Sequence, residues 1–147
     1  MGNYKHILLA VDFFEQGDVV TNKAQALATQ NQAKLSIVHV VDSLPVVDSS
    51  YGTDMPFNMD LTAELTAQAK EKMDEIAKKL NVPSEQSWLE IGSPSSEIVR
   101  VAEENKVDLI VIGSHGRHGL ALLLGSTANS VLHHATCDVL AVRLRDQ

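Results

Sequence analysis

Asp108-Leu-Ile-Val-Ile-Gly-Ser-His-Gly-Arg-His-Gly119 is the stretch that decides the fold class, because a continuous apolar run passes directly into a glycine-rich turn. Such a run is typical of a strand that is buried on both faces, as in a parallel sheet. Gly125-Ser-Thr127 then opens a segment with helical spacing. Glycine lets backbone N–H groups approach an anion, and a helix N-terminus favours negative charge. The layout predicts a phosphate cradle, with glycine used for turn geometry alone as the alternative.

Strand-like and helix-like segments alternate along the rest of the chain. We expect strands over residues 4–11, 35–41, 87–91, 108–112 and 138–144. Helices are expected over 18–31, 61–80, from about 93 onward, and over 126–134. This alternation predicts an α/β fold in which helices cover both faces of a five-stranded parallel sheet. Residues 42–60 are expected to form a long connection that acts as a mobile flap.

Particular side chains are expected to face the core or to end the elements. The second helix carries an apolar stripe at helical spacing: Leu61, Leu65, Ala69, Met73, Ile76 and Leu80. In the last helix, Val131 and Leu132 are expected to face inward. Pro94 fits the first turn of the third helix, and Ser93 or Ser95 could cap it. The strand over 87–91 is less apolar than the others, so we place it nearer an edge of the sheet.

Length, charge and cysteine content bound the class of protein. A chain of 147 residues predicts one domain, residues 1–147. A net charge of −7 argues against a nucleic-acid binder that works by bulk charge. The chain has no apolar run near the roughly 20 residues that a membrane helix needs, so no membrane partner is expected. Cys137 is the single cysteine, and the N-terminus enters a strand-like segment at once, so we expect a cytoplasmic protein without a signal peptide.

Several catalytic and metal-binding patterns are absent from the sequence. No lysine follows a glycine loop as in a P-loop, and no Gly-x-Gly-x-x-Gly follows the first strand. Gly-x-Ser-x-Gly, the nucleophile-elbow pattern, is also missing. His133 and His134 point about 100° apart on a helix, so we interpret them as helix-end residues rather than as metal ligands near Cys137. We therefore name no catalytic residue and no metal site.

The order of these motifs resembles the universal stress protein family, a small α/β domain of the adenine nucleotide α-hydrolase-like type. The resemblance spans nearly the whole chain and rests on Ile7-Leu-Leu-Ala-Val-Asp12, Val38-His-Val-Val-Asp42, Gly92-Ser-Pro94, Ile110-Val-Ile-Gly-Ser-His-Gly-Arg117, Leu124-Gly-Ser-Thr-Ala-Asn129 and Cys137-Asp-Val-Leu-Ala-Val-Arg143. It implies the strand order 3-2-1-4-5, in which strands 1 and 4 are neighbours where the winding reverses. Ligands in such sheets bind outside the strand carboxyl ends at this reversal.

The resemblance implies ATP or AMP as the ligand, with Mg²⁺ as a further component. Asp12 would bind the ribose or help to hold the cation, and Val40 would pack on adenine; capping of the turn and plain core packing are the alternatives for these two. The implied binding residues are Ala10, Asp12, Val40, Gly113, Ser114, His115, Gly116, Arg117, Gly125, Ser126 and Thr127. It also implies a homodimer that pairs the last strand, residues 138–144, with its copy.

The glycine motif departs from the family pattern by one residue. Eight residues, Arg117 to Leu124, separate Gly116 from Gly125, one fewer than in nucleotide-binding members. A one-residue deletion can shift a loop by up to about 3.5 Å. The tail Val142-Arg-Leu-Arg-Asp146 resembles a branch of the family that lacks the glycines. A nucleotide-free dimeric interaction module is therefore the alternative function, and a slow ATPase or autokinase is a third, although the sequence supplies no evident general base for it.

Overall fold

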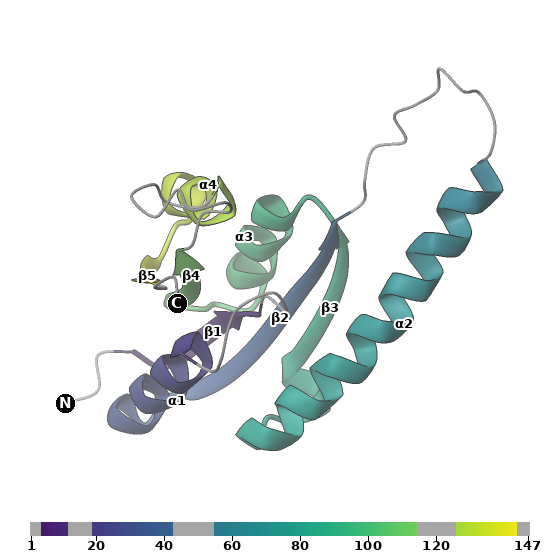
Figure 1. Ribbon diagram of the computed structural model, residues 1–147. Helices are drawn as coiled ribbons and strands as arrows, with labels where there is room; N and C mark the ends of the chain where they lie inside the picture. Colours follow the sequence, from purple (N-terminus) through teal and green to yellow (C-terminus); the bar gives the residue numbers. More distant parts are fainter. Residues whose placement is uncertain (1–3, 12–18, 43–54, 115–125, 144–147) are drawn as a thin grey trace.

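The structure is a computed structural model that describes residues 4–11, 19–42, 55–114 and 126–143. Strands and helices alternate along these ranges, as the sequence predicts (Figure 1). The elements are β1 (His6–Ala10), α1 (Val19–Asn31), β2 (Lys34–Asp42), α2 (Met55–Leu80), the short 3₁₀ turn η2 (Ser84–Gln86), β3 (Ser87–Gly92), α3 (Pro94–Glu104), β4 (Leu109–Ser114), α4 (Ser126–His134) and β5 (Asp138–Arg143).

The described strands form one parallel sheet of five strands in the order β3-β2-β1-β4-β5. This order confirms the expected fold. In the centre of the sheet, Leu9 of β1 lies opposite Ile37 of β2 and Val111 of β4. All five residues of β1 are buried, which explains why Ile7 to Ala10 form an uninterrupted apolar run. The winding reverses between β1 and β4, so the carboxyl ends of these two strands lie side by side.

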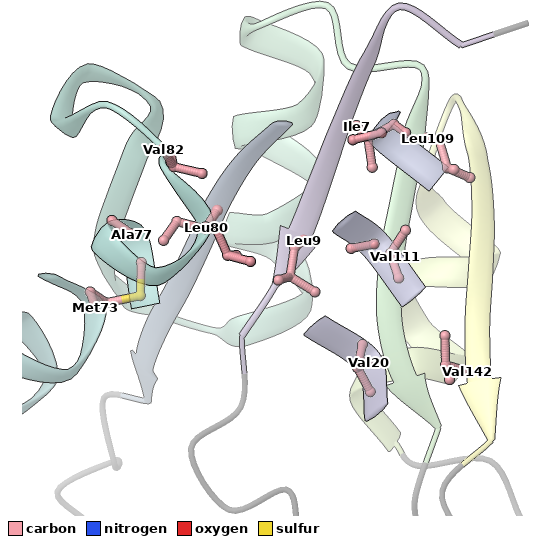
Figure 2. Packing of buried hydrophobic residues seen from close by; sticks show 13 residues of the cluster. Ile7, Leu9, Val20, Met73, Ala77, Leu80, Val82, Leu109, Val111 and Val142 are labelled. Atoms are coloured by element: carbon pink, nitrogen blue, oxygen red, sulfur yellow. The ribbon is translucent and has the colours of Figure 1, made fainter. Parts of the chain in front are cut away.

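Two apolar layers hold the helices against the sheet. On one face, alternate residues of the strands meet α1 and α2, and Figure 2 shows Leu9 and Val111 in this layer with Val20 of α1 and Met73 of α2. The remaining strand residues meet α3 and α4 in a second layer: Leu8, Ala10, Val38, Val40, Ile110 and Ile112, with Ile98 and Val131 from the helices. Full burial of one such aliphatic side chain contributes about 1.5–3 kcal/mol. These layers are the main source of stability.

Helix α2 begins at Met55, six residues before the expected start, so the prediction of a connection over residues 42–60 is wrong in its extent. Proline at position 56 does not prevent this start, because a proline in the first turn loses no intrahelical hydrogen bond. The predicted flap is reduced to residues 43–54, which lie outside the described residues. In Figure 1, the N-terminal part of α2 extends beyond the sheet.

Two side chains expected in the core are exposed instead. Leu65 of α2 is 40% exposed, whereas Ala69, one turn later, is 5% exposed. Leu132 of α4 is 43% exposed, whereas its neighbour Val131 is fully buried. Adjacent residues of a helix point about 100° apart, so a narrow contact with the sheet buries one of them. The apolar stripe in the sequence therefore marks a helical face without fixing how much of it is covered.

The ends of the helices follow the expected chemistry in part. Ser93 is the N-cap residue of α3 and Pro94 is its first residue, but the Ser93 side chain makes no capping hydrogen bond. The Ser93 carbonyl instead accepts from the N–H of Glu97 at 2.9 Å. After α3, Lys106 adopts a left-handed conformation with φ 56°. This turn lets the N–H of Val107 donate to the Ala102 carbonyl at 2.9 Å, a Schellman-type helix end that glycine normally provides.

Candidate functional site at the carboxyl ends of β1 and β4

The expected adenine contacts come from one face of the sheet. Ala10 at the end of β1 is 6% exposed, and Val40 of β2 is 8% exposed. Both belong to the apolar layer that packs against α3 and α4, together with Ile112 of β4. Ala10 lies directly opposite Val38, two residues before Val40. The structure therefore brings together these two predicted residues, at the edge of the sheet where β1 and β4 end.

The last two residues of β4, Gly113 and Ser114, are half-buried and lie at this same edge. They pair with Val142 and Arg143 of β5. The Ser114 hydroxyl donates a hydrogen bond to the Val142 carbonyl at 3.1 Å. Because the hydroxyl proton is already donated within the sheet, the contribution that Ser114 can make to an anion in this arrangement is through its backbone. The hydrogen bond also ties the start of the glycine turn to the edge strand.

Helix α4 presents its N-terminus to the same side of the sheet. Ser126 and Thr127 are its first two residues, and Ala128, which is 1% exposed, anchors the first turn against the strands. The first N–H groups of a helix have no intrahelical partner and carry a partial positive charge. The first turn of α4, which is part of the predicted phosphate site, therefore offers N–H donors and partial positive charge to an anion. Asp12, His115, Gly116, Arg117 and Gly125, the other predicted binding residues, lie outside the described residues.

Sequence reasoning missed a role for His39 at this edge. Its Nδ1 atom lies 2.7 Å from the carbonyl oxygen of Val11, the residue that follows β1. The Val11 N–H donates to the Val38 carbonyl at 2.8 Å. The sequence does contain a signal for this role, since a polar ring stands within the buried run Ile37-Val-His-Val-Val41. A polar side chain in such a strand needs a hydrogen-bond partner, and here the partner is the backbone of the neighbouring strand.

A second polar cluster lies at the opposite edge, where the strands begin. His6, which is 7% exposed, places Nε2 2.7 Å from the Ser36 hydroxyl and Nδ1 3.0 Å from the Asn105 carbonyl. Burial lowers the pKa of His6 below its ordinary value. The carboxylate of Asp108 accepts from the backbone N–H groups of Lys5 and His6. These contacts join β1 to the start of β2 and to the turn before β4. They stabilise the fold and lie at the edge of the sheet opposite to the crevice.

The cysteine and the paired histidines of the C-terminal region have structural partners. Burial raises the pKa of the Cys137 thiol, which is the reverse of what an activated thiolate needs. The Nδ1 of His134 donates to the Ser130 carbonyl at 2.9 Å, one turn earlier in α4. Within the described ranges, no group of three or more His, Cys, Asp or Glu residues could hold a metal ion. None of the described helices is both long and apolar enough to cross a membrane.

A hollow of about 380 Å³ lies away from the crevice, between the C-terminal ends of α1 and α2. Its floor is apolar and includes Ala28, Leu35 and Leu80, and its rim carries uncharged polar side chains. No charged residue lines it, so it does not suit a phosphate group. The segments 12–18 and 115–125, which follow β1 and β4 in the chain, lie outside the described residues. The site is therefore defined here by its strand ends and by the first turn of α4.

Comparison with known proteins identifies close relatives over the whole length of the chain. The model of the universal stress protein family matches residues 3–143. Universal stress protein A homolog 2 of Coxiella burnetii (strain RSA 493 / Nine Mile phase I) is 42% identical over 146 residues, which cover 99% of each chain. Universal stress protein UspA from Lactobacillus plantarum superposes with a TM-score of 0.80 at 26% identity, over 97% of this chain and 100% of that one. A universal stress protein in complex with cAMP superposes with a TM-score of 0.62 at 22% identity, over 97% and 98% of the two chains. The last likeness shows a shared fold.

Proposed function

The chain belongs to the universal stress protein family, and we propose that it binds an adenine nucleotide, ATP or AMP, in the crevice between β1 and β4. One observation carries the proposal: the reversal of winding, the Ala10–Val40 face and the first turn of α4 meet at the carboxyl edge of the sheet. This is the position where sheets of this kind bind ligands. The cAMP complex of a protein with the same fold supports an adenine nucleotide as the class of ligand.

Each part of the proposed site has a chemical role. Ala10 and Val40 supply an apolar surface for the adenine ring. Asp12 accepts from the ribose or helps to hold Mg²⁺, which prefers carboxylate oxygens. The phosphates accept hydrogen bonds from backbone N–H groups, including those in the first turn of α4, and from the hydroxyls of Ser126 and Thr127. From the end of β4 the proposal includes Gly113 and Ser114, and from the segment between β4 and α4 it includes His115, Gly116, Arg117 and Gly125.

In this proposal the protein acts in the cytoplasm as a stress-response protein whose nucleotide state is read by a partner protein. A second candidate is a nucleotide-free homodimeric interaction module. Its homodimer would form at the edge strand β5, where Val139, Leu140 and Ala141 remain half-buried in the single chain. An apolar edge strand is a template for pairing with another strand, and a strand that pairs with its own copy satisfies two-fold symmetry. The dimer is compatible with both candidates.

The two candidates are separated by the nucleotide content of the purified protein. Denaturation of the protein should release adenine nucleotide, measured by its ultraviolet absorbance and identified by chromatography. Calorimetry with ATP and Mg²⁺ should then give a measurable affinity for the protein stripped of nucleotide. A stripped, folded protein that shows neither heat nor affinity favours the interaction module. Light scattering tests the dimer, and a monomer at micromolar concentration would contradict the pairing of β5.

A glycine substitution tests the assignment of the phosphate site. Replacing Gly125 with valine adds a branched side chain where the backbone is proposed to meet phosphate, and we expect the affinity for ATP to fall at least about 30-fold. His133→Val is the matched control, because this exposed residue lies in the last turn of α4 and its loss should leave the affinity unchanged. If folded Gly125→Val binds ATP as tightly as the parent, the phosphates are held elsewhere.

A further inference from the structure

We infer that His39 is a positioning residue for the crevice: its ring holds the carbonyl of Val11, the residue that follows β1, at the point where the chain leaves the sheet. The inference rests on the proposed nucleotide site and adds to it a residue that does not itself touch the ligand. It is carried by two hydrogen bonds to Val11 and by the place of His39 in the register of the sheet.

The hydrogen bond from His39 fixes the orientation of the peptide group that joins Val11 to Asp12. A carbonyl oxygen only accepts, so Nδ1 of His39 carries the proton and donates it to Val11 O over 2.7 Å. The peptide group before Val11 is held separately, because its N–H donates to the Val38 carbonyl at 2.8 Å. Peptide groups are planar, so holding one atom in each of two successive groups leaves the chain little freedom as it leaves the sheet.

The register shows why a side chain performs this task. The last residue of β1 that pairs with β2 is Ala10, opposite Val38. Val11 follows the end of β1, and His39 is the residue of β2 that comes after this last pair. The imidazole therefore continues the attachment of β1 to β2 by one residue past the end of the paired ladder. An ordinary aliphatic residue at position 39 would fill the space but would offer the Val11 carbonyl no donor.

His39 and Val40 divide two tasks between the two faces of one strand. Successive side chains of a strand point to opposite faces. Val40 lies in the layer that packs against α3 and α4, on the face proposed for adenine, so His39 belongs to the other face. One dipeptide therefore supplies both a contact surface for the base and a support for the strand exit that precedes Asp12. Binding groups act well only when supporting contacts hold them close to their productive geometry.

Two substitutions separate the hydrogen bond from the bulk of the ring. His39→Leu introduces an apolar side chain of comparable size that lacks the donor, whereas His39→Asn can place its side-chain N–H near the position of Nδ1. We expect Leu to raise the Kd for ATP with Mg²⁺ about tenfold and Asn to remain within about threefold of the parent. We also expect amide exchange at Val11, whose N–H donates to the Val38 carbonyl, to accelerate without nucleotide in the Leu variant and not in the Asn variant. His133→Leu, in the last turn of α4, should match the parent in both measurements.

The outcomes distinguish this inference from the proposed function. If the stripped parent binds no adenine nucleotide, the proposed function fails and the positioning role fails with it. If the parent binds and His39→Leu binds equally well, the inference alone is overturned. An equal loss of affinity in the Leu and Asn variants, with equal losses of thermal stability, would also overturn it, because packing rather than the donor would then be responsible.

Discussion

Replacing Ser36 with alanine is expected to lower the free energy of unfolding by about 1–3 kcal/mol, although Ser36 lies far from the crevice edge of the sheet. The Ser36 side chain is fully buried, and its oxygen lies 2.7 Å from Nε2 of His6. Nδ1 of the same ring donates to the Asn105 carbonyl at 3.0 Å. In the neutral ring Nε2 is therefore an acceptor, and the Ser36 hydroxyl is its donor.

The magnitude follows from the burial of both partners. His6 is 7% exposed, so water cannot readily replace the lost donor, and alanine leaves Nε2 as an unsatisfied buried acceptor. The cost is then the desolvation of that atom rather than the smaller net value of an exposed hydrogen bond. For a chain of this size, each kcal/mol corresponds to a fall in Tm of about 2–4 °C. The loss should be visible in both thermal and urea unfolding.

The assay is urea unfolding followed by circular dichroism at neutral pH, with Ser96→Ala as the matched control. Ser96 is exposed on α3, so its replacement should change the free energy of unfolding by less than about 0.5 kcal/mol. The reasoning is refuted if Ser36→Ala and Ser96→Ala lose the same stability within that margin. Such a result would mean that the Ser36 hydroxyl does not satisfy His6 in solution.

Three further predictions concern stability. Burial lowers the pKa of His6 in the folded protein, so at about pH 6.5 the unfolded chain binds more protons, and the free energy of unfolding should fall as the pH drops below this value. In urea titrations, His6→Phe should lose less free energy of unfolding than the parent between about pH 7.5 and 5.5. Met73→Ala should cost about 2–5 kcal/mol because Met73 is 2% exposed, whereas Leu65→Ala, at 40% exposure, should cost less than about 1 kcal/mol by the same titration. Lys106→Gly should raise Tm slightly. Glycine removes about 1 kcal/mol of strain at φ 56°, and the larger backbone entropy that it loses on folding offsets part of this gain. A lowered Tm would contradict that account.

Much of the fold could be predicted because strands of a buried parallel sheet have a plain signature. The run from Ile7 to Ala10 is apolar at every position and is buried at every position, so its sequence reports its environment directly. The start of α2 could not be found in this way. The helix begins at Met55, and its N-terminal part extends beyond the sheet in Figure 1, where no core-facing periodicity marks a boundary. The exposure of Leu65 could not be predicted for the same reason, because an apolar stripe on a helix does not indicate how much of the helix the sheet covers.

The candidate site could be predicted in outline and not in its supporting contacts. Ala10 and Val40 were expected at the crevice and lie together on one face. The hydroxyl of Ser114 and the ring of His39 both bind backbone carbonyls of neighbouring strands. A sequence shows that such side chains are polar, but their partners depend on the register between strands that are distant along the chain. Contacts of this kind become visible when the strand order is known.

The position of β1 in the middle of the sheet has a consequence for how the chain reaches its folded state. Along the chain β1 precedes the other described strands, and β2, the next strand, pairs with one of its edges. Its other edge pairs with β4, about a hundred residues later in the chain, and the Tyr4 hydroxyl meets the Asp138 carboxylate of β5 at 2.8 Å. Contacts of such long sequence separation slow folding. Until β4 is available, β1, which is buried along its whole length in the folded protein, therefore carries an open edge that invites non-native pairing.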